Sequence, residues 1–573
     1  MRLRQMRRAA SKIEGERSSV LDLSRGRLVL VSAFFVLAYA ILVLRAFDLT
    51  VIQAVDKEAK AQHEELVQNS VKSGESRRSD IVDRNGVILA TTLKISSLFA
   101  DSKRIADPAS AAKKLIKIFP EMSYGDTLQK LQSGKRFIWL KRRITPEQKI
   151  EVLKIGEPGL EFEHEYQRFY PQENLAVHMV GYTSLDNQGL SGIERSFDPL
   201  LSKGQEPLRL TLDVRLQHAL RRELKKSMDS FEAIGAAGVI MDINTGEILG
   251  ASSLPDFNPH QIKKVEDKEL FNRVTLGVYE LGSVFKIFST AVFFEEKNVP
   301  VNVTFDATQP VKAGRFEIND YHAENRILTA PEVFMYSSNI GSAMMGQAVG
   351  TERLKAFYRD LGLLDPLDFE VREVARPLVP NPWTDISTLT ASYGHGLATT
   401  PLQLTAAVSS IVNGGYLVKP RLVLDDEPFY DENERISIVS NETVQRMRAF
   451  MRLVVTDGTG RNADVKGYRV GGKTGTAEKI VNGRYDRKKL ISSFIGVFPM
   501  DEPRYAIYIA VDEPKGQKWS YGYATAGWVA APAVKNVISS MASIMGIVPA
   551  KEDSPQQNFG SSLKQYVSIK KKH

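Results

Sequence analysis

The longest apolar segment of the chain is an uncharged run over residues 28–44, which continues past Arg45 to Phe47. Because a helix rises about 1.5 Å per residue, residues 28–47 would extend about 30 Å, the thickness of the hydrocarbon core of a bilayer. Arg45, near the end of the run, can extend toward the headgroups. The pattern predicts one membrane-spanning helix near the N-terminus.

Two other interpretations of this run compete with a membrane anchor. Ala38-Tyr39-Ala40 has the small-x-small form of a signal-peptide cleavage site, but the apolar run continues past it to Leu44. A buried soluble helix would normally carry a polar stripe. Eight Lys and Arg residues precede the run, whereas residues 48–65 carry two Lys and five acids. The positive-inside rule therefore places the N-terminus in the cytoplasm and the rest of the chain outside.

Beyond the apolar run, helical and strand patterns alternate. Residues 48–72 are charged and lack Gly and Pro, which predicts a helix leaving the membrane. Alternating Ile and Val around Asn85-Gly86 predict a β-hairpin within residues 78–90. Residues 107–155 have helical spacing with Lys-rich faces.

The pattern changes near residue 205, where we place a domain boundary. A strand is predicted over residues 208–213, a helix over 214–230, and a strand, turn and second strand over 236–251. The tail after Pro549 is polar and Lys-ended, which predicts disorder. The predicted parts are a basic cytoplasmic tail (1–27), the membrane helix (28–47), a first outer domain (48–205), a second outer domain (206–548) and the tail (549–573).

Charge and cysteine content exclude several classes of protein. The net charge is +8, but residues 1–27 contribute +5 and residues 551–573 contribute +3, so residues 28–550 sum to zero. A nucleic-acid enzyme would carry its basic patch on the folded body. The chain has no Cys, which excludes disulfides, Cys-ligated zinc and a Cys nucleophile. The eight His are scattered without a metal-binding spacing, so we expect no metal site.

The first candidate catalytic motif is Ser283-Val284-Phe285-Lys286, which opens a helical stretch ending at residue 297. Residues i and i+3 share a helix face, so the Ser283 hydroxyl and the Lys286 amine would meet. The helix dipole and burial both disfavour a protonated Lys there. A neutral Lys beside a Ser hydroxyl is a nucleophile with its base. Ser-x-x-Lys alone also occurs by chance in ordinary helices.

Two further motifs follow in the chain. Ser337-Ser338-Asn339 lies on a predicted loop before a helix rich in Gly, Ala and Met. Its hydroxyl and amide could converge on a third group, or the motif could simply cap the helix. The other motif is Gly471-Gly472-Lys473-Thr474-Gly475-Thr476-Ala477. Its small residues allow a strand to pass close to a ligand, and its Lys and Thr side chains suit a carboxylate.

The third motif overlaps a false match to a phosphate-binding loop. Gly467-x-x-x-x-Gly472-Lys473-Thr474 fits the pattern, but such a loop must lead into a helix. Residues 476–481 instead lead to the turn Asn482-Gly483, and a second strand is predicted over 490–497. A Lys on a hairpin strand is the wrong context for an ATPase.

Ser-x-x-Lys, Ser-x-Asn and Lys-Thr-Gly in this order resemble the penicillin-binding proteins and serine β-lactamases. Over about residues 25–545 the chain resembles class B penicillin-binding proteins. It is most similar to the division-specific, FtsI-type transpeptidases, on the grounds of its short N-terminus and of Tyr279-Glu280-Leu281-Gly282. Two departures are Ser79, where the family usually has Gly, and Ser338, where β-lactamases often have Asp. The other segments that carry the resemblance are 83–86, 168–171, 189–194, 210–213, 400–404 and 457–460.

The resemblance implies an α+β fold: a single N-terminal transmembrane helix, an elongated pedestal of the dimerisation type (48–205), and a transpeptidase domain with helices around an antiparallel sheet (206–548). It implies a substrate that is a peptidoglycan stem peptide ending in D-Ala-D-Ala, with no metal or organic cofactor. The implied catalytic residues are Ser283 as nucleophile, Lys286 as base, Ser337 as proton relay and Asn339 as an orienting group. The implied substrate-binding residues are Lys473, Thr474, Gly475 and Thr476.

The resemblance also implies partners and a location. β-Lactams would acylate the same serine, and an FtsW-type glycosyltransferase and other division proteins of the membrane would bind the anchor and pedestal. The catalytic domain would lie on the periplasmic side of the inner membrane, at the septum. The alternatives are an elongation-specific class B transpeptidase, a β-lactamase or D,D-carboxypeptidase, a penicillin-sensing receptor and an inactive division scaffold.

Overall fold

The structure is a computed structural model that describes Leu42 and residues 77–314, 316–424, 435–481, 483–550, 561–565 and 567. The predicted helix over 48–72 and, apart from Leu42, the predicted membrane helix over 28–47 lie outside the described residues. Among the described residues, no helix combines the length and the apolar character that crossing a bilayer requires. The chain divides into residues 1–77 and 78–573, and the fold below belongs to the second unit.

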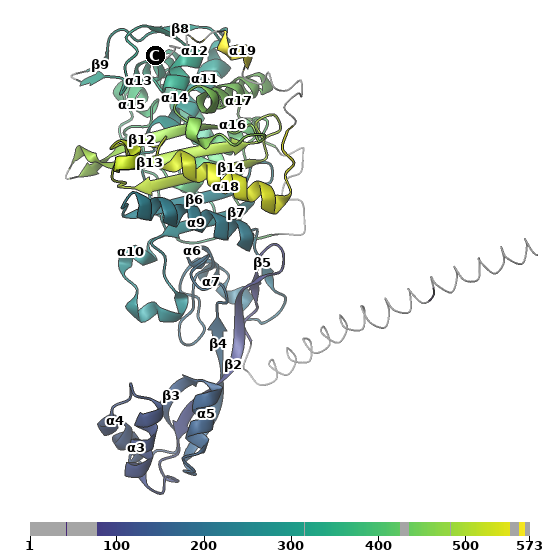
Figure 1. The fold of residues 1–573 in the computed structure, drawn as a ribbon, viewed down its shortest axis with the longest axis vertical. Helices are drawn as coiled ribbons and strands as arrows, with labels where there is room; N and C mark the ends of the chain where they lie inside the picture. The colour runs from purple at the N-terminus through teal and green to yellow at the C-terminus, as the bar shows by residue number, and fades with distance from the viewer. Residues whose placement is uncertain are drawn as a thin grey trace, which may run out of the picture. The chain divides into compact units, whose positions relative to one another are not determined.

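The predicted hairpin is confirmed at the start of this unit. Strand β1 (Ile81–Val82) pairs antiparallel with β2 (Ile88–Ala100), and the turn between them contains Gly86 at a φ of +85°, a conformation that favours Gly. Strand β2 also pairs with β3 (Ile138–Ile144) and β4 (Leu160–Phe169). Strand β1 pairs in parallel with β5 (Leu208–Arg209), so the chain re-enters this sheet just before the second domain begins (Figure 1).

The stretch predicted to be helical over 107–155 contains three helices, α3 (Pro108–Ile118), α4 (Tyr124–Leu131) and α5 (Pro146–Leu153). Strand β3 interrupts them, so the prediction is wrong there. The buried residues of β3 are Leu140 and Ile144. A spacing of four fits one face of a helix as well as alternate positions of a strand, and only pairing with β2 decides between them.

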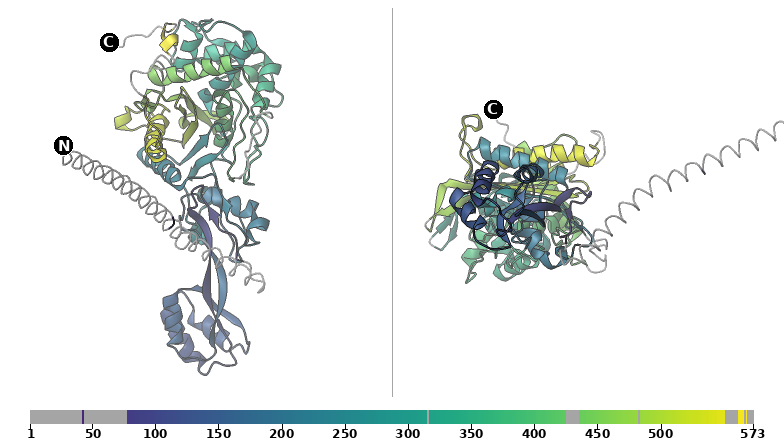
Figure 2. Two further views of the ribbon diagram at one scale, coloured as in Figure 1. Left: turned by 90° about the vertical axis from the view of Figure 1, so that its right-hand side faces the viewer. Right: turned by 90° about the horizontal axis from the view of Figure 1, so that it is seen from below.

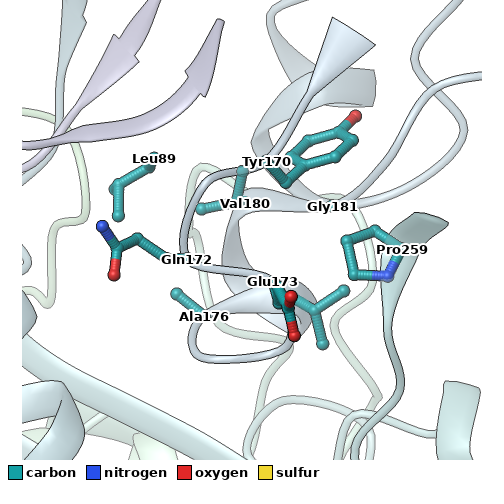
Figure 3. Close-up of a pocket in the computed structure, with 9 residues that line it drawn as sticks. Leu89, Tyr170, Gln172, Glu173, Ala176, Val180, Gly181 and Pro259 are labelled. Carbon is teal, nitrogen blue, oxygen red and sulfur yellow. The ribbon is translucent and has the colours of Figure 1, made fainter. Parts of the chain in front are cut away.

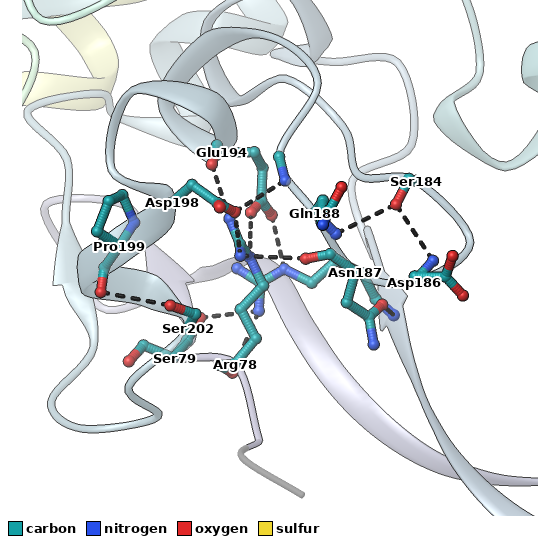
Figure 4. A network of polar contacts seen from close by, with 12 residues as sticks. Arg78, Ser79, Ser184, Asp186, Asn187, Gln188, Glu194, Asp198, Pro199 and Ser202 are labelled. Atoms are coloured by element: carbon teal, nitrogen blue, oxygen red, sulfur yellow. Dashed lines mark hydrogen bonds and ion pairs between the residues drawn. The ribbon is translucent and has the colours of Figure 1, made fainter.

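A buried charge network joins Arg78, at the start of this unit, to the rest of the domain (Figure 4). Glu194, on α7 (Gly192–Ser196), has no exposed surface and accepts from Arg78 Nε and Arg168 Nε, each at 2.6 Å. Arg78 Nη1 also donates to Asp198 Oδ1 at 2.6 Å. Each guanidinium is therefore paired, which a buried charge requires.

Removing Glu194 is expected to destabilise the protein strongly. In Glu194→Ala the two guanidiniums would stay buried without their shared carboxylate, which typically costs about 3–5 kcal/mol. The free energy of unfolding in urea measures the loss. The matched control is Glu206→Ala, which removes an exposed carboxylate and should change stability by less than about 0.5 kcal/mol. Equal losses in both variants would show that the network does not stabilise the fold.

The second domain is built on a five-stranded antiparallel sheet in the order β12-β13-β14-β6-β7. The strands are β6 (Gly235–Asp242), β7 (Ile248–Leu254), β12 (Gly471–Val481), β13 (Arg484–Phe498) and β14 (Tyr505–Asp512). Every residue of β6 and β14 is buried, because both faces of the sheet are covered. The strand, turn and strand predicted over 236–251 are confirmed, and so is the strand that carries Lys473.

Helices cover the two faces of this sheet (Figures 1 and 2). On one face α9 (Val214–Ser230) and α18 (Ala530–Met545) share a core with the sheet. On the other, α11 (Lys286–Lys297), α16 (Pro401–Val412) and α17 (Asn441–Thr456) form the largest core. Helix α9 has the predicted bounds, and Asp213 caps it by accepting from Arg215 N. These layers confirm an α+β catalytic domain.

Shorter elements complete the described fold. The helices are α6 (Val177–Val180), α8 (Asp198–Leu201), α10 (Asp267–Leu270), α12 (Ala330–Tyr336), α13 (Asn339–Val349), α14 (Thr351–Asp360), α15 (Asp385–Ala391) and α19 (Ser561–Lys564). The strands are β8 (Thr304–Asp306), β9 (Val311–Ala313), β10 (Phe316–Ile318) and β11 (Ile327–Thr329). The 3-10 segments are η2 (Pro259–Lys264), η3 (Gly282–Phe285), η5 (Arg461–Ala463) and η6 (Lys518–Ser520).

Helix α19 differs from the disorder predicted for the tail after Pro549. Leu563 is only 6% exposed and belongs to the same core as α11 and α17. Lys564 Nζ lies 3.1 Å from Asp457 Oδ2. A single Leu in a polar segment gives no periodic signal, so this docking could not be predicted from the pattern.

A small cavity lies where α6 meets η2 (Figure 3), and none of the residues that line it belongs to the candidate catalytic motifs. Leu89, Tyr170, Val180 and Pro259 are among the residues that line it. Its volume of about 10 Å³ is enough for about one water molecule. We therefore assign it no ligand.

Candidate active site

Ser283 lies in the 3-10 segment η3, which leads directly into α11, so the motif opens the predicted helical stretch to residue 297, but with a first turn of 3-10 form. Its neighbours Val284 and Phe285 are buried, whereas Ser283 keeps partial exposure. Gly282 has a φ of +54°, and a Cβ at Gly394 would lie 2.0 Å from the Gly282 carbonyl oxygen. The turn is thus held between close backbone neighbours with the Ser283 side chain left accessible.

Strand β12 packs directly against this turn. A Cβ at Gly475 would lie 2.6 Å from the Leu281 carbonyl oxygen and 2.7 Å from Val284, so no larger residue fits there. The Thr476 carbonyl oxygen would lie 3.1 Å from a Cβ at Gly282. Because β12 is at the edge of the sheet, its outer side has no strand partner among the described residues.

The Ser337-Ser338-Asn339 segment connects α12 to α13. Ser338 is the N-cap of α13 and accepts from Gly341 N at 3.0 Å. The capping role therefore belongs to Ser338, which leaves Ser337 and Asn339 as the candidates for a role in the site. Ser337 has a φ of +62°, an uncommon left-handed conformation for a residue with a side chain. Such backbone strain clusters at functional sites.

The structure brings two Lys amines to one hydroxyl. Lys286 Nζ donates to Asn339 Oδ1 at 2.8 Å, to Ser337 Oγ at 3.1 Å and to the Ser337 carbonyl oxygen. Lys473 Nζ donates to the same Ser337 Oγ at 2.8 Å. In the part of the chain that the structure describes, no hydrogen bond joins Lys286 to Ser283, which differs from the contact predicted from their i, i+3 spacing.

Burial controls the protonation of both amines, neither of which has exposed surface. Burial lowers the pKa of Lys286 to about 7, and the negative charge of Asp320 opposes this shift. Burial lowers the pKa of Lys473 well below its usual value, and the nearby charge of Lys286 adds to the effect. A neutral Lys286 is therefore accessible near neutral pH, as a base requires.

Sequence reasoning missed Asp320. Its carboxylate accepts from Ser338 Oγ at 2.7 Å and from the backbone N–H groups of Asn339 and Ile340. It thereby fixes the start of α13 and the orientation of Asn339. Asp320 lies 18 residues before Ser338 on an irregular segment, so no local pattern indicates it.

The Thr hydroxyls of β12 are also held in place. Thr474 Oγ1 and Thr459 Oγ1 are 2.8 Å apart, and Thr476 Oγ1 accepts from Ala526 N at 3.1 Å. The Thr476 hydroxyl donates to no residue in the described ranges, which leaves its proton for a ligand. The arrangement offers a hydroxyl nucleophile, a neutral amine that can act as a base, a serine hydroxyl (Ser337) that contacts both amines, and a strand that carries a second amine and two Thr hydroxyls.

Comparison with known protein families identifies the family to which this chain belongs. Residues 236–539 match the penicillin binding protein transpeptidase domain, and residues 73–207 match the penicillin-binding protein dimerisation domain. This chain belongs to the penicillin-binding protein family. It is therefore a serine-type, penicillin-binding transpeptidase of class B, with both domains that the resemblance implied.

Several relatives of this transpeptidase are similar over most of their length. The probable peptidoglycan D,D-transpeptidase FtsI of Caulobacter vibrioides is 38% identical over 82% of each chain. FtsI of Escherichia coli K12 is 28% identical over 87% of this chain and 89% of its own. Among solved structures, penicillin binding protein 3 of Mycobacterium tuberculosis complexed with ampicillin is 26% identical. It covers 84% of this chain and 98% of its own, with a TM-score of 0.67.

Proposed function

We propose that this transpeptidase crosslinks peptidoglycan stem peptides through an acyl-enzyme on Ser283. The observation that carries the proposal is the convergence of the buried Lys286 and Lys473 amines on Ser337 Oγ, beside the turn that bears Ser283. The reaction is acyl transfer from the D-Ala-D-Ala end of one stem to an amine of another.

In the acylation step, Ser283 Oγ attacks the carbonyl of the penultimate D-Ala. The neutral Lys286 amine takes the Ser283 proton. The proton then passes through Ser337 to the departing D-Ala, whose nitrogen leaves as an amine. Asn339 holds the Lys286 amine while the proton moves. Backbone N–H groups of Ser283 and Thr476 would stabilise the negative charge that develops on the carbonyl oxygen.

The substrate's terminal carboxylate would bind at Lys473, Thr474 and Thr476. In the empty site two neighbouring amines disfavour each other's charge, but an arriving carboxylate favours the protonated form of Lys473. The outer edge of β12 can pair with an extended peptide through main-chain hydrogen bonds, which places the scissile carbonyl at Ser283. Gly475 lets the strand lie close enough to the turn for both contacts.

The direct test combines the full-length protein with a stem peptide ending in D-Ala-D-Ala and an amine acceptor. We expect release of D-Ala together with a new amide product. A β-lactamase or D,D-carboxypeptidase would transfer the acyl group to water and release penicillin quickly. Rapid turnover of bound penicillin without any amide product would favour that alternative.

We also propose that the protein is a single-pass inner-membrane protein that acts at the septum. The apolar run over 28–47 and its basic flank support the anchor. Similarity to FtsI proteins supports the division role. Pairing with an FtsW-type glycosyltransferase and other division proteins is part of the same proposal and follows from the resemblance to division-specific transpeptidases. As part of this proposal we keep the domain limits predicted from the sequence, 48–205 for the pedestal and 206–548 for the transpeptidase domain.

Exchanging the anchor is expected to impair the role in division without affecting acylation of the active site. Replacing residues 28–47 with an unrelated apolar span of equal length should keep penicillin labelling but impair division, because the partner contact would be lost. Labelling of membranes with fluorescent penicillin and counts of septa measure the two effects. Depletion of the wild-type protein should block septation while growth continues. Cells that septate normally but lose their shape would indicate the elongation-specific alternative.

A further inference from the structure

A second group of polar side chains lies beside the Ser283 turn and has no role in the acylation step. Glu280, three residues before Ser283, accepts from Gly396 N at 3.1 Å and from the Tyr485 hydroxyl at 3.1 and 3.2 Å. These contacts join the Ser283 turn to the loop after α15 and to the β12–β13 hairpin. Burial raises the pKa of Glu280, yet within the described ranges its carboxylate has no salt bridge.

His395 completes the group. Its ring centroid lies 5.1 Å from that of Tyr393 and 5.5 Å from that of Tyr485. Burial, assisted by the charge of Lys286, lowers the pKa of His395 to about 4, so the imidazole is neutral at pH 7. Its Nδ1 is buried and makes no hydrogen bond to any described residue. An unsatisfied buried ring nitrogen is costly unless a ligand uses it. The Glu280 carboxylate is held by two neutral donors and, among the described residues, has no cation paired with it.

The second half of the reaction requires a ligand of matching chemistry. A primary amine must approach the acyl-enzyme at Ser283, and at neutral pH it arrives as an ammonium ion. Lys473 and the Thr hydroxyls are already assigned to the carboxylate of the acyl donor, and they offer no negative charge to an ammonium group. Glu280 supplies the opposite charge, and His395, which shares Tyr485 with Glu280 as a neighbour, supplies a neutral ring nitrogen.

We propose that Glu280 and His395 bind and orient the ammonium group of the acceptor peptide. This rests on the crosslinking function proposed above. The acceptor nitrogen loses one proton to solvent and attacks the acyl carbon. The bond between that carbon and Ser283 Oγ breaks, and Lys286 passes a second proton from the nitrogen to Oγ. The third proton stays on the nitrogen of the new amide, so all three ammonium protons are accounted for and no further reactant is needed.

The position of Gly394 supports this placement. Its backbone packs against the Gly282 carbonyl, which puts the following residue, His395, beside the nucleophile turn. Tyr485 holds the Glu280 carboxylate from the hairpin side. Acceptor binding would therefore involve the turn, the loop and the hairpin together.

The test measures how the acyl-enzyme partitions between an amine and water. The full-length protein is acylated with a thioester analogue of the stem peptide, and thiol release gives the acylation rate. D-Alaninamide serves as the charged acceptor, and hydroxylamine, which is uncharged at neutral pH, serves as a neutral one. In Glu280→Gln the ratio of amide product to hydrolysis should fall about tenfold or more with D-alaninamide, the loss expected for one charge-assisted hydrogen bond. The ratio with hydroxylamine should fall much less.

Two further variants keep the test decisive. Tyr485→Phe removes only the hydroxyl that holds Glu280 and should produce a smaller fall of the same kind. Asp486→Asn removes a carboxylate from the same hairpin, outside the Glu280 contacts, and should leave the ratio unchanged. If Glu280→Gln lowered the acylation rate and both acceptor ratios equally, Glu280 would have only a structural role and the proposal would be overturned. An unchanged ratio with D-alaninamide in this variant would overturn it as well. A wild-type protein that acylates but transfers to no amine would instead overturn the crosslinking function itself.

Discussion

Ser283→Ala is expected to give a folded protein that forms no covalent adduct with penicillin. Ser283 is the partly exposed hydroxyl on the η3 turn, beside the free edge of β12 and the amine pair around Ser337. Without its Oγ no acyl-enzyme can form, so crosslinking should also be abolished. Mass spectrometry of the intact protein after incubation with penicillin measures the adduct.

The matched control is Ser543→Ala, which removes an exposed hydroxyl on α18. It should acylate like the wild type, and both variants should unfold at the wild-type temperature. An adduct that persists in Ser283→Ala, located on another serine by peptide mapping, would overturn the assignment of the nucleophile.

Lys286→Ala and Lys473→Ala are expected to fail in different ways. Loss of a general base typically lowers a rate by about 10²–10⁴-fold, so Lys286→Ala should lose acylation by every substrate. Lys473→Ala should weaken capture of substrates that carry the terminal carboxylate more than capture of analogues without it. Rates of acylation by matched substrates with and without the carboxylate measure the difference. Equal losses on both substrates in both variants would contradict separate roles.

The wild-type acylation rate should also depend on pH. The base is the neutral amine of Lys286, whose pKa is lowered to about 7 by burial. Protonation below that pKa removes the base, so the rate should rise as the pH increases from about 6 to about 8 and then level off. A rate that stays flat across this interval would indicate that another group takes the proton.

Local patterns predicted much of the fold. Helix α9 ends where its apolar spacing ends, and the β1–β2 hairpin follows from Asn85-Gly86. Strand β3 was missed because a spacing of four suits either structure. Contacts between segments far apart in the chain also could not be predicted from local patterns. Helix α19, for example, is held by packing against a core that other helices form.

The candidate site was predictable in its residues but not in its contacts. The three motifs supplied Ser283, Lys286 and Lys473, yet their spacing suggested that Lys286 would contact Ser283. In the structure the Lys286 amine donates to Ser337 and Asn339 instead. Asp320 has no sequence signal, because its place depends on how an irregular segment folds over the start of α13.

The backbone packing around the nucleophile also limits how this protein could evolve resistance to antibiotics. A Cβ at Gly394 or Gly475 would collide with the backbone of this turn, and Gly282 has a left-handed φ of +54° that a residue with a side chain rarely adopts. Mutations at these positions would damage wall synthesis and drug binding alike. Substitutions that confer resistance are therefore expected outside these three positions, and each would be limited by whether the natural peptide is still accepted.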